Sequence, residues 1–414
     1  SDDAGWWKSQ SVITIGCLVL TMIAGLGASK TGMSSVIAFA ITGFALALWT
    51  FVRWIGRASI LKSLAFLTGA MVFTVWCAGV IWGSRYKMPL FWETMTWKAN
   101  IHHDTFYYGS IANMLDTYGV PTTGLDGIPI IRYHFGSPWL FAQWAHLLNV
   151  DVLSFYSLGY PVIVLPLFFW ALLLFSVELR AAFGIAPGEG LRSDWRAWLF
   201  FLAATVGFLP TVALDALAVW NSNAFISESY LIAMPVFFLL LGSALAFWAD
   251  NKTSKPRTGG VSAIGYLMVF LPLMLAVSGF LKISLMLLSL GVALWLFLRL
   301  GLFRRPVAVA SLLLSFVAAG LTYRVVSLPA QNGGISPLHF MRFDAAEGWQ
   351  QFFPLIHLLW TWVYIALRVW EDGARDGRSL IQSIRAGRLI DAEVLLVVAV
   401  LGFLPGEIVS IHGG

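Results

Sequence analysis

Long apolar runs separated by short polar connections dominate the chain. Runs of about 20 apolar residues recur along its length, and a helix of that length crosses the hydrocarbon core of a bilayer. A transmembrane β-barrel would instead show short segments of alternating polarity. The pattern therefore predicts an all-α, polytopic integral membrane protein, a single transmembrane domain of residues 1–414 with about eleven spans. The predicted spans are residues 11–28, 33–52, 63–83, 152–177, 197–214, 230–249, 261–279, 282–299, 306–323, 352–369 and 392–410.

The composition agrees with a membrane location. Hydrophobic residues make up 59% of the chain and charged residues 11%, whereas a soluble domain carries roughly 25% charged residues. So few charges cannot cover the surface of a water-soluble protein, which excludes an ordinary soluble enzyme. Cys17 and Cys77 both lie inside apolar runs, so they are expected to be small buried hydrophobic residues without a disulfide framework or a cysteine metal site.

Basic residues gather in alternate connections between the predicted spans. Because Lys and Arg are retained on the cytoplasmic side of membranes, this pattern predicts a cytoplasmic N-terminus and an extracytoplasmic C-terminus in the bacterial inner membrane. The net charge of +5 is then explained by basic residues on the cytoplasmic side of the membrane, and no nucleic-acid partner is expected. The longest inner connection, 371–391, is interpreted as a solvated basic connector. The basic residues are Arg53, Arg57, Lys62, Arg180, Arg192, Arg196, Lys252, Lys255, Arg257, Arg299, Arg304, Arg305, Arg368, Arg375, Arg378, Arg385 and Arg388.

The first long outer connection, residues 84–151, is expected to contain two interfacial helices. After Asp104, apolar residues recur at helical spacing until Gly119, which with Pro121 forms a stop signal. Ser137 and Pro138 then predict the start of a second helix, with Ser137 as N-cap, that continues from Trp139 to Leu148. The apolar positions of the first helix are Tyr107, Ile111, Met114, Leu115 and Tyr118.

Asp104 has two compatible interpretations. At the start of a helix, an aspartate commonly caps free backbone amides. A carboxylate fixed at the membrane surface can also act as a general base. One of the two histidines before it, His102 or His103, could join it at a divalent cation, and His103 is the candidate, although no third, distant ligand is evident.

The stretch Asp104-x-x-Tyr107-Tyr108-x-x-x-Ala112-x-x-Leu115-x-x-x-Gly119-x-Pro121 resembles the first outer loop of the GT-C superfamily. These integral-membrane glycosyltransferases use polyprenyl-phosphate-linked sugars. In the superfamily this loop usually follows the first span, whereas here it follows the third predicted span.

The resemblance implies a role for each of several residues. Asp104 would be the base that takes a proton from the acceptor hydroxyl, and Arg132 and His134 would stabilise the leaving phosphate, with a divalent cation, Mg or Mn, as a further source of positive charge. Lys282, at an outer span end, either snorkels to the interface or contacts the phosphate of the donor. In the second long outer connection, residues 324–351, His339 and Arg342 are either candidates for binding phosphate or sugar or members of an ordinary polar loop.

Two other classes of function compete with a transferase. A non-catalytic accessory subunit of a larger membrane complex would keep the architecture without the chemistry, and it would bury an apolar flank against protein partners. A transporter would carry ionisable residues at mid-membrane and broken helices in matched halves, and neither feature is evident in the sequence.

Overall fold

The computed structural model describes residues 64, 68, 69, 71, 72, 75, 103–124, 130, 135–186, 189–206, 228–252, 263–326, 335–337, 359–376 and 379–411. The predicted spans 11–28 and 33–52 lie outside the described residues. Only scattered positions of 63–83 are described, and 197–214 and 352–369 are described in part.

Long apolar helices form the body of the described part of the chain. Four of them are long and apolar enough to cross a membrane: Ile163–Phe183, Glu228–Asn251, Ala263–Leu281 and Pro306–Val326. A shorter apolar helix covers Ile283–Arg299. These helices are compatible with the predicted integral membrane protein, and each falls on a predicted span. The helices of the body are α8 (Tyr160–Phe183), α12 (Glu228–Lys252), α14 (Leu271–Leu281), α15 (Ile283–Arg299), α16 (Pro306–Val326), α18 (Leu359–Asp376) and α20 (Ile390–Ile408).

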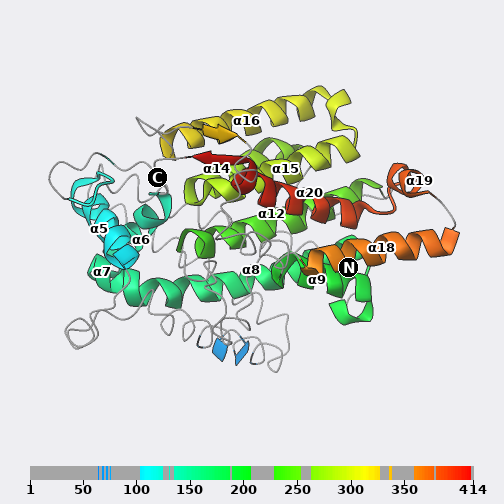
Figure 1. Ribbon diagram of the computed structural model, residues 1–414. Helices are drawn as coiled ribbons and strands as arrows, with labels where there is room; N and C mark the ends of the chain where they lie inside the picture. Colours follow the sequence, from blue (N-terminus) through cyan, green and yellow to red (C-terminus); the bar gives the residue numbers. More distant parts are fainter. Residues whose placement is uncertain are drawn as a thin grey trace, which may run out of the picture.

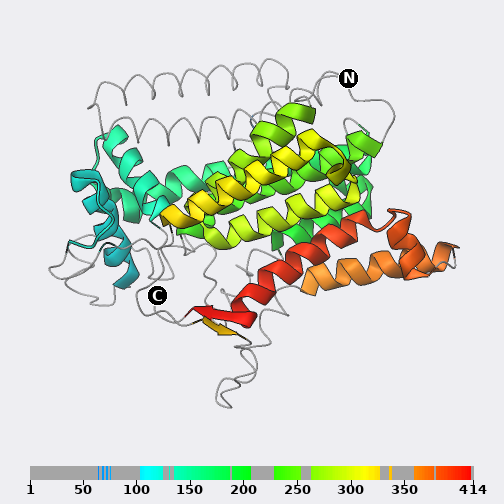
Figure 2. The same ribbon diagram turned by 90° about the horizontal axis from the view of Figure 1, so that it is seen from above.

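These helices run side by side along one long axis (Figures 1 and 2). α12 packs against α8, α14 and α15, α14 packs against α16, and α15 packs against α20. α18 packs against α20 and against α9 (Trp195–Val206). A short antiparallel pair, β1 (Ile335–Pro337) with β2 (Val409–Ile411), is the one sheet within the described residues.

The helix bundle has two chemically different ends. The loop end carries α5 (His103–Tyr118), α6 (Gly136–Leu148), α7 (Val152–Ser154) and the turn at Lys282 (Figure 1). The basic end carries the start of α9, the 3₁₀ turns η2 (Leu191–Ser193) and η4 (Leu302–Arg304), and α19 (Leu380–Arg385). Arginines of separate connections, among them Arg192, Arg304 and Arg385, gather at the basic end, as the charge pattern predicts. The cellular compartment that this end faces stays a prediction.

Close approach between α8 and α12 depends on Gly242. A Cβ atom added at Gly242 would collide with the Glu178 carboxylate and would press on Phe175. Phe175 also stacks on Phe238, with ring centroids 5.5 Å apart. Small residues let transmembrane helices approach in this way, since lipid supplies no hydrophobic drive between helices.

Two helices contain a π-helical turn. The chain from Val152 to Phe183 is helical throughout, but Phe155–Gly159 (η1) separates α7 from α8. In the same way, Tyr266–Phe270 (η3) separates α13 (Ala263–Gly265) from α14. Each π turn holds one more residue than an α turn, so the side chains beyond it face a different direction.

The predicted span 152–177 begins as expected but ends six residues late, at Phe183. Asp151 caps its start, because its carboxylate accepts hydrogen bonds from the amides of Leu153, at 3.1 Å, and Ser154, at 2.7 Å. Burial disfavours the charged carboxylate, but these hydrogen bonds outweigh it and hold the pKa of Asp151 below its ordinary value. At the other end the helix runs on until Gly184 ends it in a left-handed conformation.

Candidate functional site

The first helix of the loop end, α5, begins at His103. Asp104 therefore lies within the first helical turn, and its interpretation as the N-cap is wrong. The side chains of His103 and Asp104 lie outside the described residues. The start at His103 still places a carboxylate near the helix N-terminus, where the backbone amides favour negative charge.

The buried face of α5 differs in part from the predicted face. Ile111, Ala112 and Leu115 are buried and pack toward α6, but Tyr107 is 40% exposed and Tyr118 is 69% exposed. The tyrosines were assigned to the apolar face by spacing alone, whereas an aromatic hydroxyl favours a position at the polar surface. The predicted stop is confirmed, because Gly119 follows the helix with a positive φ of 67°.

An acidic residue and a histidine connect α5 to α6. His146 Nδ1 lies 3.4 Å from the Asp116 carboxylate. Burial raises the pKa of Asp116 above its ordinary value, and the neighbouring His146 opposes that shift. His146 is exposed, so its imidazole joins α5 to α6 at the surface of the protein.

The start of α6 is fixed by contact with the end of α14. Gly136 lies so close to the carbonyl group of Phe280 that a Cβ atom would not fit. The rings of Phe135 and Trp139 both meet the ring of Phe280 edge-on, with centroids 5.9 Å and 5.5 Å away. The helix begins at Gly136, with Phe135 at the cap position and no side-chain cap, so the prediction of Ser137 as N-cap is wrong. Ser137 is instead buried inside the helix.

Lys282 occupies the turn between α14 and α15, outside both helices. Its backbone is extended, with φ −157° and ψ 112°, and its amide donates to the carbonyl of Ser278 at 2.7 Å. The Nζ atom lies 4.5 Å from the centre of the Tyr230 ring, which is close enough for a cation–π contact. The Tyr230 hydroxyl in turn accepts a hydrogen bond from Ser284 at 3.3 Å.

The ammonium group of Lys282 is largely buried, so few water molecules can solvate it. Burial lowers the pKa of Lys282 to about 8, and the nearby Glu228 carboxylate, which is 2% exposed, acts in the opposite direction. The side chain is therefore largely protonated at neutral pH, although water stabilises it less than it would stabilise an exposed lysine. A partly desolvated cation of this kind interacts strongly with a bound anion.

The structure brings together two of the predicted regions. Phe135 directly follows His134 in the chain, and its ring contacts Phe280, two residues before Lys282. Arg132, His134, His339 and Arg342 themselves lie outside the described residues, so their predicted roles stay predictions. Among the residues that the structure describes, no three His, Cys, Asp or Glu side chains form a group that could hold a metal ion.

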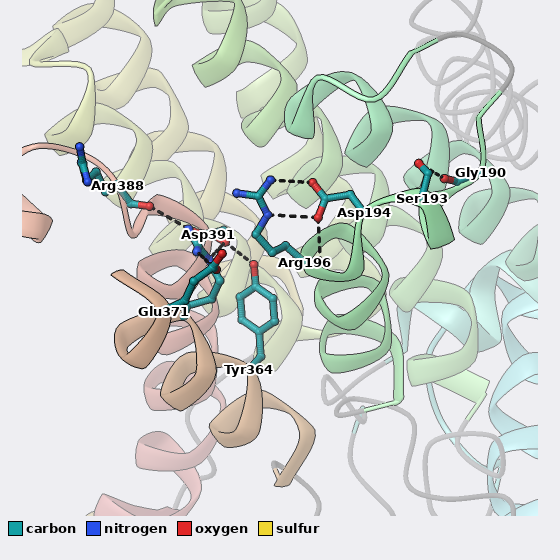
Figure 3. Close-up of polar contacts among 9 residues, drawn as sticks. Gly190, Ser193, Asp194, Arg196, Tyr364, Glu371, Arg388 and Asp391 are labelled. Atoms are coloured by element: carbon teal, nitrogen blue, oxygen red, sulfur yellow. Dashed lines mark hydrogen bonds and ion pairs between the residues drawn. The ribbon is translucent and has the colours of Figure 1, made fainter. Parts of the chain in front are cut away.

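A second polar cluster lies at the basic end (Figure 3). Arg368 on α18 donates from Nε to Asp391 at 2.7 Å, from Nη1 to Glu371 at 2.7 Å, and from Nη2 to the carbonyl of Arg388 at 3.0 Å. The hydroxyl of Tyr364 also donates to Asp391. These bonds join α18 to the start of α20, and the Arg368 side chain is 11% exposed.

Further ion pairs extend this cluster to α9 and α15. Arg196 binds both carboxylate oxygens of Asp194, at 3.1 Å from Nε and 2.9 Å from Nη2. Burial of Asp194 disfavours its charge, but the hydrogen bonds from Arg196 outweigh this and hold the pKa of Asp194 below its ordinary value. Arg299 at the end of α15 binds Glu393 on α20 at 2.6 Å.

A cavity of about 360 Å³ opens beside these ion pairs. Its apolar wall comes from the ends of α8 and α12 and from Ile390 of α20. Its polar wall comes from α9, α18, the connection between α19 and α20, and Asp391 of α20. The lining residues are Ala182, Phe183, Arg196, Leu245, Trp248, Arg368, Glu371, Asp372, Gly387, Arg388, Ile390 and Asp391.

The sequence interpretation missed this cluster. Residues 371–391 were expected to be a solvated basic connector, but Glu371 and Asp391 in this segment form partly buried pairs with Arg368. One signal was available, because Arg368 and Glu371 are three apart and share a helix face. The pairing of Arg368 with Asp391 joins residues on different helices, and spacing along the chain cannot reveal it.

Comparison with known proteins identifies no relative. No protein-family model matches the chain, and neither a curated protein nor a solved structure is similar to it.

Proposed function

We propose that this chain is a membrane glycosyltransferase of the GT-C type that transfers a sugar from a polyprenyl-phosphate donor at the loop end. The observation that carries the proposal is the position of Lys282. Its protected ammonium group lies at the end of two apolar helices, against Tyr230 and next to the packing contact with α6. The phosphate of a polyprenyl-linked donor would occupy this depth, because its lipid tail follows the apolar helices and its phosphate stays at the membrane surface.

The chemistry assigned to this end is an acid–base displacement. Asp104 takes the proton from the acceptor hydroxyl while that oxygen attacks the anomeric carbon of the sugar. The bond between the anomeric carbon and the phosphate oxygen breaks, and polyprenyl phosphate leaves with the electron pair. Lys282, Arg132 and His134 offset the charge that develops on the phosphate, and a divalent cation, Mg or Mn, held partly by His103, would add to this effect. His339 and Arg342 contact phosphate or sugar in this scheme.

Under this proposal the chain has about eleven spans. The N-terminus lies in the cytoplasm and the loop end faces the outside of a bacterial inner membrane. The four candidate spans and the gathering of arginine at the opposite end support this arrangement.

The test uses the full chain in nanodiscs with polyprenyl phosphate, Mn²⁺ and a panel of polyprenyl-phosphate sugars. We expect the wild-type protein to bind polyprenyl phosphate and to transfer a sugar. Asp104→Asn keeps binding but lowers transfer by about 10²- to 10⁴-fold, the range for a lost general base. Lys282→Gln weakens binding of the phosphate by about tenfold, as for a lost hydrogen bond to a charged group.

Arg304→Gln is the control variant. It removes an exposed cation at the basic end, so it should leave binding and transfer unchanged. A wild-type protein that does not bind polyprenyl phosphate would contradict the transferase and favour the alternative, a non-catalytic accessory subunit of a larger membrane complex.

A further inference from the structure

The cavity at the basic end lies where two candidate membrane spans end. Ala182 and Phe183 are the last residues of the span Ile163–Phe183, and Trp248 lies near the end of the span Glu228–Asn251. A tryptophan at this depth is typical of the boundary between hydrocarbon and water. The cavity therefore has an apolar wall that continues the hydrophobic surface of the helices and a polar wall at the height of the lipid headgroups.

The formal charges of the polar wall balance. Arg196, Arg368 and Arg388 line the cavity together with the carboxylates of Glu371, Asp372 and Asp391. A simple anion in the cavity would meet three carboxylates, and a simple cation would meet three guanidinium groups. A ligand that carries both signs can place each charge beside its opposite, and this balance favours a zwitterion.

Arg196 still offers a donor to a ligand. Two of its guanidinium nitrogens bind Asp194, and the remaining Nη1 atom has no hydrogen-bond partner among the described residues. Figure 3 shows Arg196 between Asp194 on one side and the group formed by Asp391 and Glu371 on the other. Arginine presents its nitrogens in a fork that suits phosphate, so this edge is the place for the anionic part of the ligand.

Asp372 offers an acceptor that is buried and unused. Its side chain is 10% exposed, and its Oδ1 atom lies 3.6 Å from Arg388 Nη1. Its Oδ2 atom is buried and has no hydrogen-bond partner among the residues that the structure describes. An unsatisfied buried acceptor is costly, so a ligand with an N–H donor stabilises the site.

We propose that this cavity binds the headgroup of a phospholipid that carries a primary ammonium group and a phosphodiester, of the phosphoethanolamine type. The phosphodiester binds Arg196 and Arg388, the ammonium group donates to Asp372, and the acyl chains follow Phe183 and Trp248 into the membrane. A volume of about 360 Å³ suits such a headgroup, because small-molecule pockets start at about 300 Å³. The site is independent of the transferase proposed for the loop end.

The test is native mass spectrometry of the purified full chain with an equimolar mixture of phosphatidylethanolamine, phosphatidylcholine and phosphatidylglycerol that share the same acyl chains. We expect phosphatidylethanolamine to be retained about tenfold more than phosphatidylcholine, since the choline group has no N–H to donate to Asp372. Equal retention of these two lipids by the wild-type protein would overturn the proposal, and this comparison needs no variant.

Two variants test separately the contact of the ammonium group and the contact of the phosphodiester. Asp372→Asn should abolish the preference for phosphatidylethanolamine over phosphatidylcholine, and Arg196→Gln should lower the retention of both lipids. The control Arg304→Gln, an exposed arginine of the same end outside the cavity, should change neither. A preference for phosphatidylethanolamine that survives Asp372→Asn, or a retention of both lipids that Arg196→Gln leaves unchanged, would place the bound lipid elsewhere and overturn the site.

A soluble headgroup distinguishes a lipid from a free zwitterion. Glycerophosphoethanolamine has the same charged groups without acyl chains, so it should displace phosphatidylethanolamine only at much higher concentration. Displacement at an equal concentration would contradict a lipid ligand, because the apolar wall would then contribute nothing to binding.

Discussion

The ammonium group of Lys282 lies over the ring of Tyr230, with Nζ 4.5 Å from the ring centre. This contact joins the turn between α14 and α15 to the first turn of α12, and it holds a cation at the loop end in a partly desolvated position. The same turn is fixed from the other side by α6, through Phe280. Three separate segments of the chain thus position one basic group.

The first prediction concerns the titration of Lys282. Since its folded-state pKa is lowered to about 8, the amine should lose its proton with a midpoint near that value, about two pH units below an ordinary lysine. The folded chain disfavours the charged form, so this penalty on stability is full below about pH 8 and disappears as pH rises toward the pKa of the unfolded chain, about 10.4. NMR of ¹³C-methylated lysines measures the midpoint, and Lys282→Arg assigns the signal by its loss.

Binding of a phosphate should move this titration upward. An anion near Lys282 favours the charged form, so polyprenyl phosphate should raise the midpoint, and its affinity should fall as pH rises above about 8. A midpoint that stays the same with and without the ligand would contradict a phosphate contact at Lys282.

The second prediction concerns the contact between α6 and α14. Gly136→Ala would force its new methyl group against the carbonyl of Phe280, at a cost of about 1–3 kcal/mol, the usual range for overpacking. We expect a lower Tm and faster proteolysis of the connection before α6. Gly320→Ala is the matched control, because open space surrounds that glycine of α16, and it should leave both measurements unchanged.

If Gly136→Ala and Gly320→Ala behaved alike, α6 would not be seated against the end of α14. The position of Lys282 relative to the first outer connection would then need revision.

The third prediction concerns the ion pairs of the basic end. Arg368→Met leaves Asp391 and Glu371 without their cation, and loss of one partner of a buried pair costs about 3–5 kcal/mol. The double variant Arg368→Met with Asp391→Asn should recover part of this loss, since the uncompensated charge at Asp391 is removed as well. Thermal unfolding of the four proteins of the cycle, including Asp391→Asn alone, measures the coupling.

Additive effects of the two changes would show that Arg368 and Asp391 act independently. Arg304→Gln serves as the control for the loss of a positive charge at this end, and it should leave the Tm unchanged.

The sequence predicted the apolar helices and several of their ends. The span 306–323 corresponds to Pro306–Val326, and the stop at Gly119 is confirmed. These features are local, because they depend on a run of apolar residues or on one residue with a special backbone conformation. The long helices could therefore be predicted from the order of residues alone.

Features that join distant segments of the chain could not be predicted in this way. The π turns at Phe155–Gly159 and Tyr266–Phe270 add one residue to a helix without a change in polarity, so hydropathy cannot detect them. The pairs of Arg299 with Glu393 and of Arg368 with Asp391 depend on how α15, α18 and α20 pack. The expectation that residues 371–391 form a solvated basic connector failed for this reason.

The unequal exposure of the ion pairs at the basic end has a consequence for ionic strength. The side chains of Arg196 and Arg388 are 37% and 40% exposed, but that of Arg368 is 11% exposed. Dissolved ions screen charges that they can approach, with a Debye length of about 8 Å at physiological ionic strength, and act much less on buried pairs. Added salt should therefore loosen the rim of the cavity at Arg196 and Arg388 while the junction of α18 and α20 at Arg368 remains closed.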